Sequence, residues 1–194
     1  MRYADLGLSP ELMRAIDKKG YVQATPVQGG SIPYFMEYKD VIAKAPTGTG
    51  KTFAFGIPMV EHIDGVRRRA GPGAGPHPGA GGADPGGAAG SVRVQGGGTH
   101  RLPLRRGPID RQINTLKKKP QIVVATPGRL MDHMKRRTVR LDKVQTVVLD
   151  EADRMLDMGF VRDVTRILDQ LKHRRNLGMF SATISREVMD ISWV

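Results

Sequence analysis

The sequence contains no cysteine, which excludes disulfide bonds and thiolate metal sites. It also lacks any apolar run close to the length of a membrane span. The first ten residues, MRYADLGLSP, have no apolar core of the kind that a signal peptide needs, so we expect a cytoplasmic protein without membrane contact. A globular chain remains, and 194 residues are enough for one ordinary domain with a hydrophobic core.

Acidic residues are scarce relative to basic ones. The resulting net charge of +12 points to a polyanionic partner such as nucleic acid. The excess is unevenly placed, because residues 65–106 contain seven Arg, no Lys and one Asp and so carry half of it. The rest of the chain is only mildly basic, and bulk charge is therefore weaker evidence than the motifs.

Apolar runs alternate with helical patterns along the chain. Ser9-Pro10 and Thr25-Pro26 are typical helix starts. Apolar runs that predict strands precede residue 46 and occupy Gln121–Ala125, Thr146–Leu149 and Gly178–Ser181. The alternation predicts an α/β fold with a central parallel sheet and helices on both faces. Ligands bind such sheets at the carboxyl ends of the strands, which is where the strongest motifs lie.

The first motif, APTGTGKT at residues 45–52, resembles a P-loop, with Ala45 in place of the first glycine. Gly48 and Gly50 allow the backbone N–H groups to face phosphate, and the following helix adds the positive end of its dipole. Lys51 is then expected to reach the β and γ phosphates, and the Thr52 hydroxyl to ligate Mg²⁺. We expect the whole loop to bind the cofactor, through Thr47, Gly48, Thr49, Gly50, Lys51 and Thr52.

In the second motif, VVLDEAD at residues 147–153, two adjacent carboxylates follow an apolar strand. Asp150 suits a Walker B aspartate that holds Mg²⁺ through water. Glu151 suits orientation or deprotonation of the attacking water. A solvated acidic turn is the simpler interpretation of these letters alone. Together with Lys51, they predict a catalytic site for ATP hydrolysis.

The letters D-E-A-D at residues 150–153 also name a family. The chain resembles the first RecA-like domain of the DEAD-box RNA helicases over about Tyr3–Asp64 and Gly107–Val194. The resemblance implies that residues 1–194 are the N-terminal, ATP-binding RecA-like domain, a P-loop NTPase, of an ATP-dependent RNA helicase. It implies ATP and Mg²⁺ as cofactors and RNA as partner, in a monomer. A second RecA-like domain, normally in cis, supplies an arginine finger in this family, and we expect this sequence to lack it.

GYVQATPVQ at residues 20–28 resembles the Q motif of that family. The resemblance implies that Gln28 binds the adenine edge, that Thr25 supports the phosphate loop, and that an aromatic residue upstream stacks on the base. Tyr3 is the candidate for stacking, although Phe is commoner there. Without the resemblance, an exposed helix residue is the simpler interpretation of Gln28.

Two further motifs match the family. TPGR implies that Thr126, Pro127, Gly128 and Arg129 hold RNA phosphates at a helix N-terminus. SAT at residues 181–183 implies that the hydroxyls of Ser181 and Thr183 bond to the DEAD carboxylates, Asp153 among them, and couple ATP to strand separation. Two alternatives stay open: the ATPase domain of a DNA translocase, and a non-catalytic RNA-binding module switched by nucleotide.

Residues 65–106 interrupt the resemblance. They contain 13 Gly, 5 Pro and 7 Arg in 42 positions, with no Lys, Glu, Ile, Met or aromatic residue. The PTREL and Gly-Gly motifs of the family belong here and are missing. One interpretation is a genuine insertion, flexible by composition, which would remove a central strand and its helix and leave the segment disordered.

The other interpretation is an out-of-frame translation. Residues 75–80 (GPHPGA), back-translated and read one base later, permit the letters APTREL. The same shift permits an amphipathic helix up to Ala89, a buried strand from Arg69, and YGG at residues 104–107, after which the normal frame resumes. Each match is permissive because one codon base is free. The whole run in the family's order is much harder to obtain by chance, so we favour a frameshift.

Overall fold

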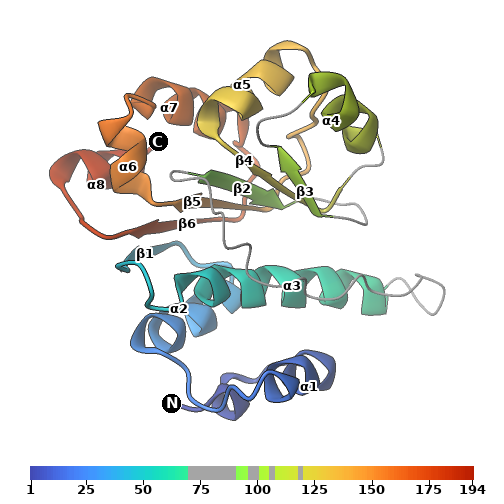
Figure 1. Cartoon of the computed structure of the whole chain (residues 1–194), viewed down its shortest axis with the longest axis vertical. Helices are drawn as coiled ribbons and strands as arrows, with labels where there is room; N and C mark the ends of the chain where they lie inside the picture. The colour runs from blue at the N-terminus through green and yellow to red at the C-terminus, as the bar shows by residue number, and fades with distance from the viewer. Residues whose placement is uncertain (70–90, 96–100, 105–107, 118–119) are drawn as a thin grey trace.

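The chain folds as an α/β domain built on a six-stranded sheet (Figure 1). This computed structural model describes residues 1–69, 91–95, 101–104, 108–117 and 120–194. The described strands are β1 (Val41–Lys44), β2 (Ser91–Gln95), β3 (Arg101–Leu104), β4 (Ile122–Ala125), β5 (Thr146–Asp150) and β6 (Asn176–Ser181). Their order in the sheet is β1-β6-β5-β2-β4-β3.

The helices follow the order that the sequence predicts. A short 3₁₀ helix, η1 (Tyr3–Leu6), precedes α1 (Pro10–Lys18) and α2 (Pro26–Met36), and α3 (Lys51–Arg69) follows β1. The others are α4 (Ile109–Leu116), α5 (Pro127–Lys135), α6 (Ala152–Asp157), α7 (Val161–Gln170) and α8 (Arg186–Ile191). Among the described residues, none of these helices combines the length and apolar character needed to cross a membrane.

Five strands run parallel, as predicted, and β2 runs antiparallel to both of its neighbours, β4 and β5. This strand and β3 lie in the 65–106 segment, where a genuine insertion was expected to be disordered. Residues 91–95 and 101–104 form these two strands and residues 65–69 complete α3, and the choice between insertion and frameshift stays a prediction. Ser91–Gln95 alternates valine with polar residues, a pattern that suits a strand. Residues 75–80, which carry the back-translated motif, lie outside the described residues.

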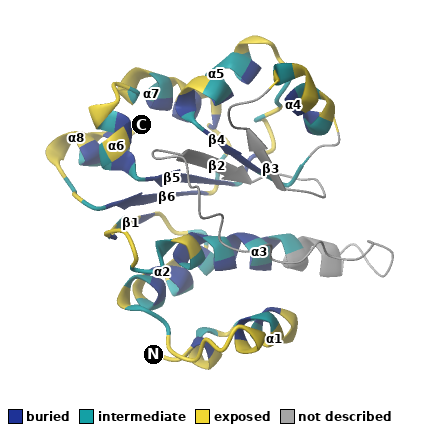
Figure 2. Ribbon diagram, in the orientation of Figure 1, coloured by how far each residue is buried: buried dark blue, intermediate teal, exposed yellow. Residues whose placement is uncertain are grey.

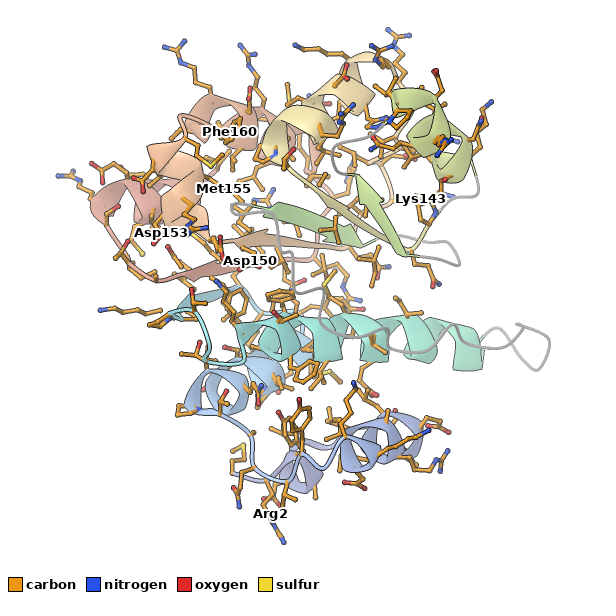
Figure 3. The ribbon with its side chains drawn as sticks, in the orientation of Figure 1. Arg2, Lys143, Asp150, Asp153, Met155 and Phe160 are labelled. Carbon is orange, nitrogen blue, oxygen red and sulfur yellow. The ribbon has the colours of Figure 1, made fainter. Side chains whose placement is uncertain are left out.

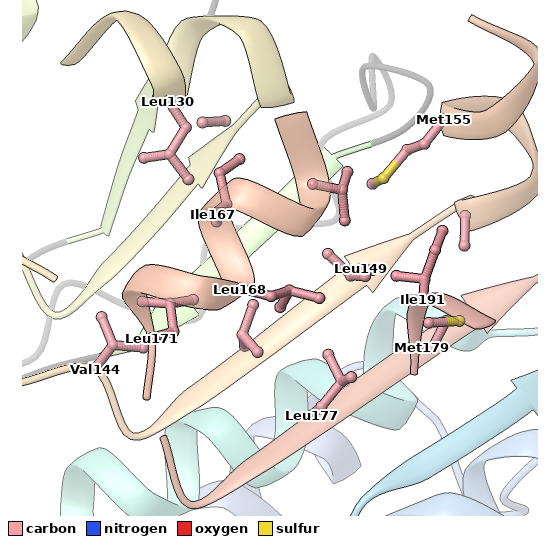
Figure 4. Packing of buried hydrophobic residues seen from close by; sticks show 14 of the residues in the cluster. Leu130, Val144, Leu149, Met155, Ile167, Leu168, Leu171, Leu177, Met179 and Ile191 are labelled. Carbon is pink, nitrogen blue, oxygen red and sulfur yellow. The ribbon is translucent and has the colours of Figure 1, made fainter. Parts of the chain in front are cut away.

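Helices cover both faces of the sheet. Helices α2 and α3 lie on one face, with α1 outside them, and α5 and α7 lie on the other (Figure 1). Strands β5 and β6 are buried along their whole length between these layers (Figure 2). On the α7 side, Leu130, Met155, Ile167 and Leu168 pack together in the largest apolar cluster of the described residues (Figure 4).

Strand β5 supplies both cores because successive side chains point to opposite faces. Val147 and Leu149 belong to the cluster beneath α7, while Val148 packs with Phe35 and Phe180 beneath α2 and α3. A close approach explains Gly178 in β6, since the Phe35 ring occupies the space that a Cβ atom would need. The sheet is therefore fixed from both sides, and the loops at its carboxyl end have a rigid base.

The predicted helix starts are confirmed in detail. The Ser9 hydroxyl accepts a hydrogen bond from Leu12 N (3.3 Å), and Thr25 accepts one from Gln28 N (3.4 Å). The apolar stripe of α7 is buried from Val164 onward, but Val161 at its first position is 39% exposed. One end of that stripe therefore lies outside the core.

Candidate functional site

The phosphate loop lies between β1 and α3, as predicted. Gly48 and Gly50 have φ angles of +83° and +77°, which are left-handed conformations that glycine adopts without steric cost. The Thr49 hydroxyl donates to Pro46 O (2.7 Å) and closes the turn. Lys51 begins α3 at the carboxyl end of the sheet, and Thr52, next along the helix, is exposed. The loop thus presents backbone N–H groups and a helix N-terminus to one site.

Lys51 contacts both carboxylates of the second motif. Its Nζ lies 3.4 Å from Asp150 Oδ1 and 3.4 Å from Glu151 Oε1. The side chains of Lys51 and Asp150 are almost buried, so their attraction is screened less than that of a surface pair. Three groups predicted from motifs about a hundred positions apart in the chain therefore meet at one point.

Glu151 has a left-handed backbone, with φ +56° and ψ +51°. This conformation is uncommon outside glycine and costs free energy. It occurs where β5 ends and α6 begins, and it turns the chain sharply after Asp150. Arg154, one helical turn later, lies 3.5 Å from Glu151 Oε2. Sequence reasoning missed this contact, although the three-residue spacing on a helix permits it.

Asp153 is bonded to the SAT motif. Its Oδ2 accepts hydrogen bonds from the Thr183 hydroxyl (3.1 Å) and the Thr183 amide (3.3 Å). The Asp153 amide donates a hydrogen bond to the Ser181 hydroxyl (3.0 Å), which is the acceptor in this contact. Figure 3 shows Asp150 and Asp153 at the same end of the sheet. The ends of β5 and β6 are therefore joined by side chains as well as by the sheet.

These bonds also affect ionisation. Burial opposes the charged form of Asp153, but hydrogen bonds from Thr183, the Arg154 amide and Ser181 outweigh it and hold the pKa below its ordinary value. The carboxylate is consequently charged at neutral pH and remains an acceptor for Thr183.

Gln28 is buried, with 2% of its surface exposed, so it is not the exposed helix residue of the simpler interpretation. Its Nε2 donates to Gly50 O in the phosphate loop (3.0 Å). Its Oε1 accepts from the Thr25 amide (3.0 Å) and from the Tyr3 hydroxyl. The glutamine therefore joins the N-terminal segment to the phosphate loop.

Tyr3 lies in the core and not over an open site. It is 3% exposed and packs with Leu12, Ile16 and Ile57 between the N-terminal helices. Burial raises its pKa, and the bond to Gln28 offsets this in part. In this conformation the ring is not exposed for stacking on a base, and the residue instead holds Gln28. The predicted stacking stays a prediction that requires the ring to become accessible.

The TPGR residues form the start of α5. Thr126 caps the helix by accepting from Arg129 N (3.4 Å), Pro127 is buried at the first position, and Gly128 is exposed. The Arg129 guanidinium lies 4.0 Å from Asp132 on the same helix. The backbone N–H groups of this helix start lie at the carboxyl end of β4, the position in which anions bind.

Comparison with known proteins decides the family. A sequence profile described as DEAD/DEAH box helicase matches residues 25–74 and 95–191, which is more than half of the chain. The chain belongs to the DEAD/DEAH box helicase family. The unmatched stretch between these ranges lies within the anomalous 65–106 segment.

Two curated relatives are bacterial helicases. The ATP-dependent RNA helicase CshA of Limosilactobacillus reuteri is 42% identical over 212 residues, which cover 98% of this chain and 38% of that protein. The DEAD-box ATP-dependent RNA helicase CshA of Geobacillus kaustophilus is 43% identical over 198 residues, covering 98% and 41%. The chain thus spans about two fifths of the length of these helicases.

Solved structures of DEAD-box proteins share the fold. A DEAD box protein from the hyperthermophile Methanococcus jannaschii superposes with a TM-score of 0.77 at 30% identity, covering 100% of this chain and 53% of that one. The yeast DEAD-box splicing factor Prp28 gives 0.76 at 25% identity, covering 99% and 49%. The predicted RecA-like α/β fold is confirmed.

Proposed function

We propose that this chain is the ATP-binding domain of an ATP-dependent RNA helicase. The observation that carries the proposal is the meeting of Lys51 with Asp150 and Glu151, beside the bonds from Asp153 to Thr183 and Ser181. A P-loop lysine, a carboxylate for metal and a carboxylate for water are the parts that phosphoryl transfer to water requires. The relatives are named ATP-dependent RNA helicases, which supports the same proposal.

The residues present fit Mg²⁺ bound with ATP. No group of three or more His, Cys, Asp and Glu side chains that could hold a metal by itself occurs within the described ranges. That donor set suits Mg²⁺, which takes one or two protein ligands and completes its shell with phosphate oxygens and water. Thr52 and Asp150 would hold it, the latter through water, and it would neutralise charge on the phosphates.

Lys51 and Glu151 then have separate tasks. Lys51 moves from the carboxylates to the β and γ phosphates, a short displacement for a flexible side chain. Glu151, released from Lys51, orients or deprotonates the attacking water. Its left-handed backbone fixes the start of its side chain, so the carboxylate needs little reorganisation.

Adenine recognition is assigned to Gln28. A carboxamide can pair one donor and one acceptor with the adenine edge. In this conformation the same atoms bond to Gly50, Thr25 and Tyr3. Binding of the base would therefore compete with the bond to Gly50, and this competition would connect the adenine to the phosphate loop.

RNA binding is assigned to the start of α5, at Thr126, Pro127, Gly128 and Arg129. The backbone N–H groups there can hold phosphates, and Arg129 can exchange its contact with Asp132 for one with RNA. Asp153, Ser181 and Thr183 would couple this site to ATP. Unwinding would require the second RecA-like domain of the whole helicase, and we expect this chain to act as a monomer.

The test of this proposal is nucleotide binding and turnover by the purified chain. We expect ATP with Mg²⁺ to bind, GTP to bind more weakly, and Lys51→Ala to abolish most affinity. Lys44→Ala is the matched control, because Lys44 is exposed at the end of β1 and should leave affinity unchanged. Equal binding of ATP and GTP contradicts the adenine assignment.

Turnover distinguishes an enzyme from a nucleotide-switched binding module. We expect residues 1–194, purified alone, to hydrolyse ATP slower by a factor on the order of 10³ or more than a complete enzyme in which an arginine finger stabilises the transition state. Glu151→Gln should remove the residual rate while nucleotide binding persists. Equal stimulation by RNA and DNA strands would favour the DNA translocase, which the names of the relatives do not support.

A further inference from the structure

A hollow lies at the end of the sheet where the parallel strands begin. It is lined by Asp142, Lys143, Val144, Gln145, His173 and Arg175, and we call it the amino-edge hollow. Figure 3 shows Lys143 and Asp150 at opposite ends of the domain's sheet. The hollow is therefore separate from the proposed ATP site and from the start of α5.

Strand pairing builds the hollow from two loops. Strands β5 and β6 are parallel, with Thr146 opposite Asn176, so the residues that precede them lie side by side. The Arg175 amide donates to Gln145 O (2.6 Å), which extends the pairing by one step below the strands. The loop containing Lys143 and the loop containing His173 are thus held at a fixed separation.

The hollow carries positive charge that the surrounding acids do not neutralise. Lys143, His173 and Arg175 are exposed, and none has an ion-pair partner within the described part of the chain. The acids nearby are engaged elsewhere: Asp142 with Arg140 (3.7 Å), and Glu37 with Lys39 (2.6 Å). Lys143 and Arg175 are therefore cations without an ion-pair partner among the described residues, and they favour an anionic ligand.

Asp40, which also lies at this edge, accepts a hydrogen bond from the Leu177 amide (2.7 Å). Its carboxylate is thereby directed at the backbone of β6. Asp142, Glu37 and Asp40 thus each have a contact with a group other than Lys143 and Arg175.

Arg175 is held by stacking. Its guanidinium carbon lies 3.4 Å from the centroid of the Tyr38 ring, and Tyr38 stacks on His62 at 3.9 Å with planes 8° apart. The His62 ring is fixed in turn by Met36 O, 3.0 Å from Nε2. Stacking uses the face of a guanidinium and leaves its N–H edge available for bidentate bonds to phosphate.

Basic residues connect this hollow with the start of α5. Beyond Arg129, the end of that helix and the loop that follows carry exposed cations: Lys135, Arg136, Arg137 and Arg140. The nine residues of α5 span roughly 13 Å, so both ends of the helix lie within reach of one short stretch of nucleic acid. Asp132 forms an ion pair with Arg136 (3.0 Å). The basic residues of this stretch still outnumber the acidic ones.

We infer that the amino-edge hollow is a second contact surface for the phosphates of single-stranded RNA that passes the start of α5. The inference rests on the proposed function, which supplies the RNA. A polymer with regularly spaced phosphates matches a series of separated cations better than a compact anion does. Contacts here would be independent of sequence and of nucleotide, because no element of the ATP site lies at this edge.

Binding of a fluorescent uridine oligonucleotide, followed by anisotropy at several salt concentrations, tests the inference. We expect Lys143→Ala with Arg175→Ala to weaken binding roughly tenfold or more at about 0.1 M salt, since each lost phosphate contact costs about fivefold there. The slope of log affinity against log salt should fall by about 0.7 per contact. ATP affinity should be unchanged.

Lys18→Ala with Lys19→Ala is the matched control. It removes the same charge from the end of α1, and RNA affinity should stay close to that of the unmodified chain. Lys143→Ala alone leaves the stack on Tyr38 intact, so it tests the hollow even if loss of Arg175 disturbs folding, and Lys18→Ala is its single-charge control. Equal RNA affinity of this variant and the control overturns the inference.

Arg129→Ala separates this inference from the proposed function. If Arg129→Ala weakens RNA binding and the amino-edge variants do not, the helicase assignment stands and the second surface does not. If the amino-edge variants keep RNA affinity but lose binding of an acidic polypeptide such as polyglutamate, the hollow is a protein-docking face, and the inference is again overturned.

Discussion

Gln28 contacts three separate parts of the domain with one carboxamide. Its bonds to Tyr3, Thr25 and Gly50 place the N-terminal segment, a helix cap and the phosphate loop in one small network. Because the group is buried, loss of one partner leaves a polar atom without water to replace it. The residue is thus sensitive to changes that lie outside the nucleotide site itself.

Tyr3→Phe distinguishes two roles of the tyrosine. The change keeps the ring and removes the hydroxyl that donates to Gln28. If Tyr3 acts by holding Gln28, we expect ATP affinity to fall several-fold and the free energy of unfolding by about 1 kcal/mol. Isothermal titration and urea unfolding measure these two effects. Tyr34→Phe, at an exposed tyrosine, is the control.

Stacking alone predicts the opposite result. A phenylalanine ring stacks on adenine as well as a tyrosine ring does, so unchanged ATP affinity in Tyr3→Phe would show that the hydroxyl has no part in nucleotide binding.

The hydrogen bonds to Asp153 make the free energy of unfolding depend on pH in a defined direction. Its folded-state pKa is lowered, so its hydrogen bonds stabilise the domain above the unfolded pKa, near 3.8, and are lost as pH falls through the folded value. The difference in unfolding free energy between the unmodified chain and Asp153→Asn should be constant above about pH 5 and shrink below about pH 4. Urea unfolding across this range measures it.

Asp5→Asn is the matched control for that measurement, since Asp5 is exposed and pairs with Arg2, which caps the start of η1. A difference for Asp153→Asn that stays constant down to the lowest pH would mean that its carboxylate is not preferentially charged in the folded state.

Among the elements, α4 and α5 are joined through one buried histidine. His133 in α5 is 0% exposed, with Nε2 2.8 Å from Gln112 Oε1 of α4 and Nδ1 2.8 Å from the Thr138 hydroxyl. Burial lowers the pKa of His133, so protonation becomes unfavourable to folding as pH falls below about 6.5. The histidine stabilises the helix pair only while it is neutral.

His133→Ala should cost about 3 kcal/mol of unfolding free energy. The change removes a buried ring and its hydrogen bonds with Gln112 and Thr138. Urea unfolding at pH 7.5 measures it, and His173→Ala, at an exposed histidine, should stay within about 0.5 kcal/mol. A loss for His133→Ala no larger than for His173→Ala would show that the network between the helices is dispensable.

The positions of the phosphate loop and of the DEAD and SAT residues could be predicted from sequence because each follows a short apolar strand. Parallel strands end at the same edge, so Lys51, Asp150 and Ser181 had to converge. The burial of Tyr3 could not be predicted, because it depends on how α1 packs on α2 and α3. The contact of Arg154 with Glu151 depends on the left-handed turn that only the backbone reveals.

The antiparallel direction of β2 could not be predicted from the sequence pattern either. Alternating residues predict a strand but not which way it runs, since direction depends on the connections on either side. The parallel expectation held for strands whose connections contain a complete helix, such as α7 between β5 and β6. It failed for β2 in the 65–106 segment, whereas β3 in the same segment runs parallel to β4.

At the scale of the whole molecule, the sheet depends on that segment. Strand β2 lies between β5 and β4, so β4 and β3 join the other strands only through residues 91–95. A composition rich in glycine and proline is an unusual source for an interior strand. The frameshift hypothesis predicts a different origin for an interior strand, because the shifted letters permit a buried strand from Arg69 and an amphipathic helix up to Ala89.

We predict that the gene, sequenced across the codons for residues 65–106, differs from the reading frame of the printed sequence by a single-base shift at each end of the segment. The intact mass of the expressed protein should then differ from the 21.2 kDa of the printed sequence. A gene that encodes these glycines and prolines in frame, in a protein that unfolds cooperatively, would show the segment to be a genuine insertion.

The left-handed backbone at Glu151 also restricts which sequences can occupy that position. A φ of +56° is tolerated by glycine and asparagine but strongly disfavours valine, isoleucine and threonine. In a library randomised at residue 151 and selected only for folding, β-branched residues should be depleted although no ATP is present. Evolution at this position is thus constrained by the shape of the turn and by the chemistry of the carboxylate. The constraint from the turn persists in descendants that no longer need the carboxylate.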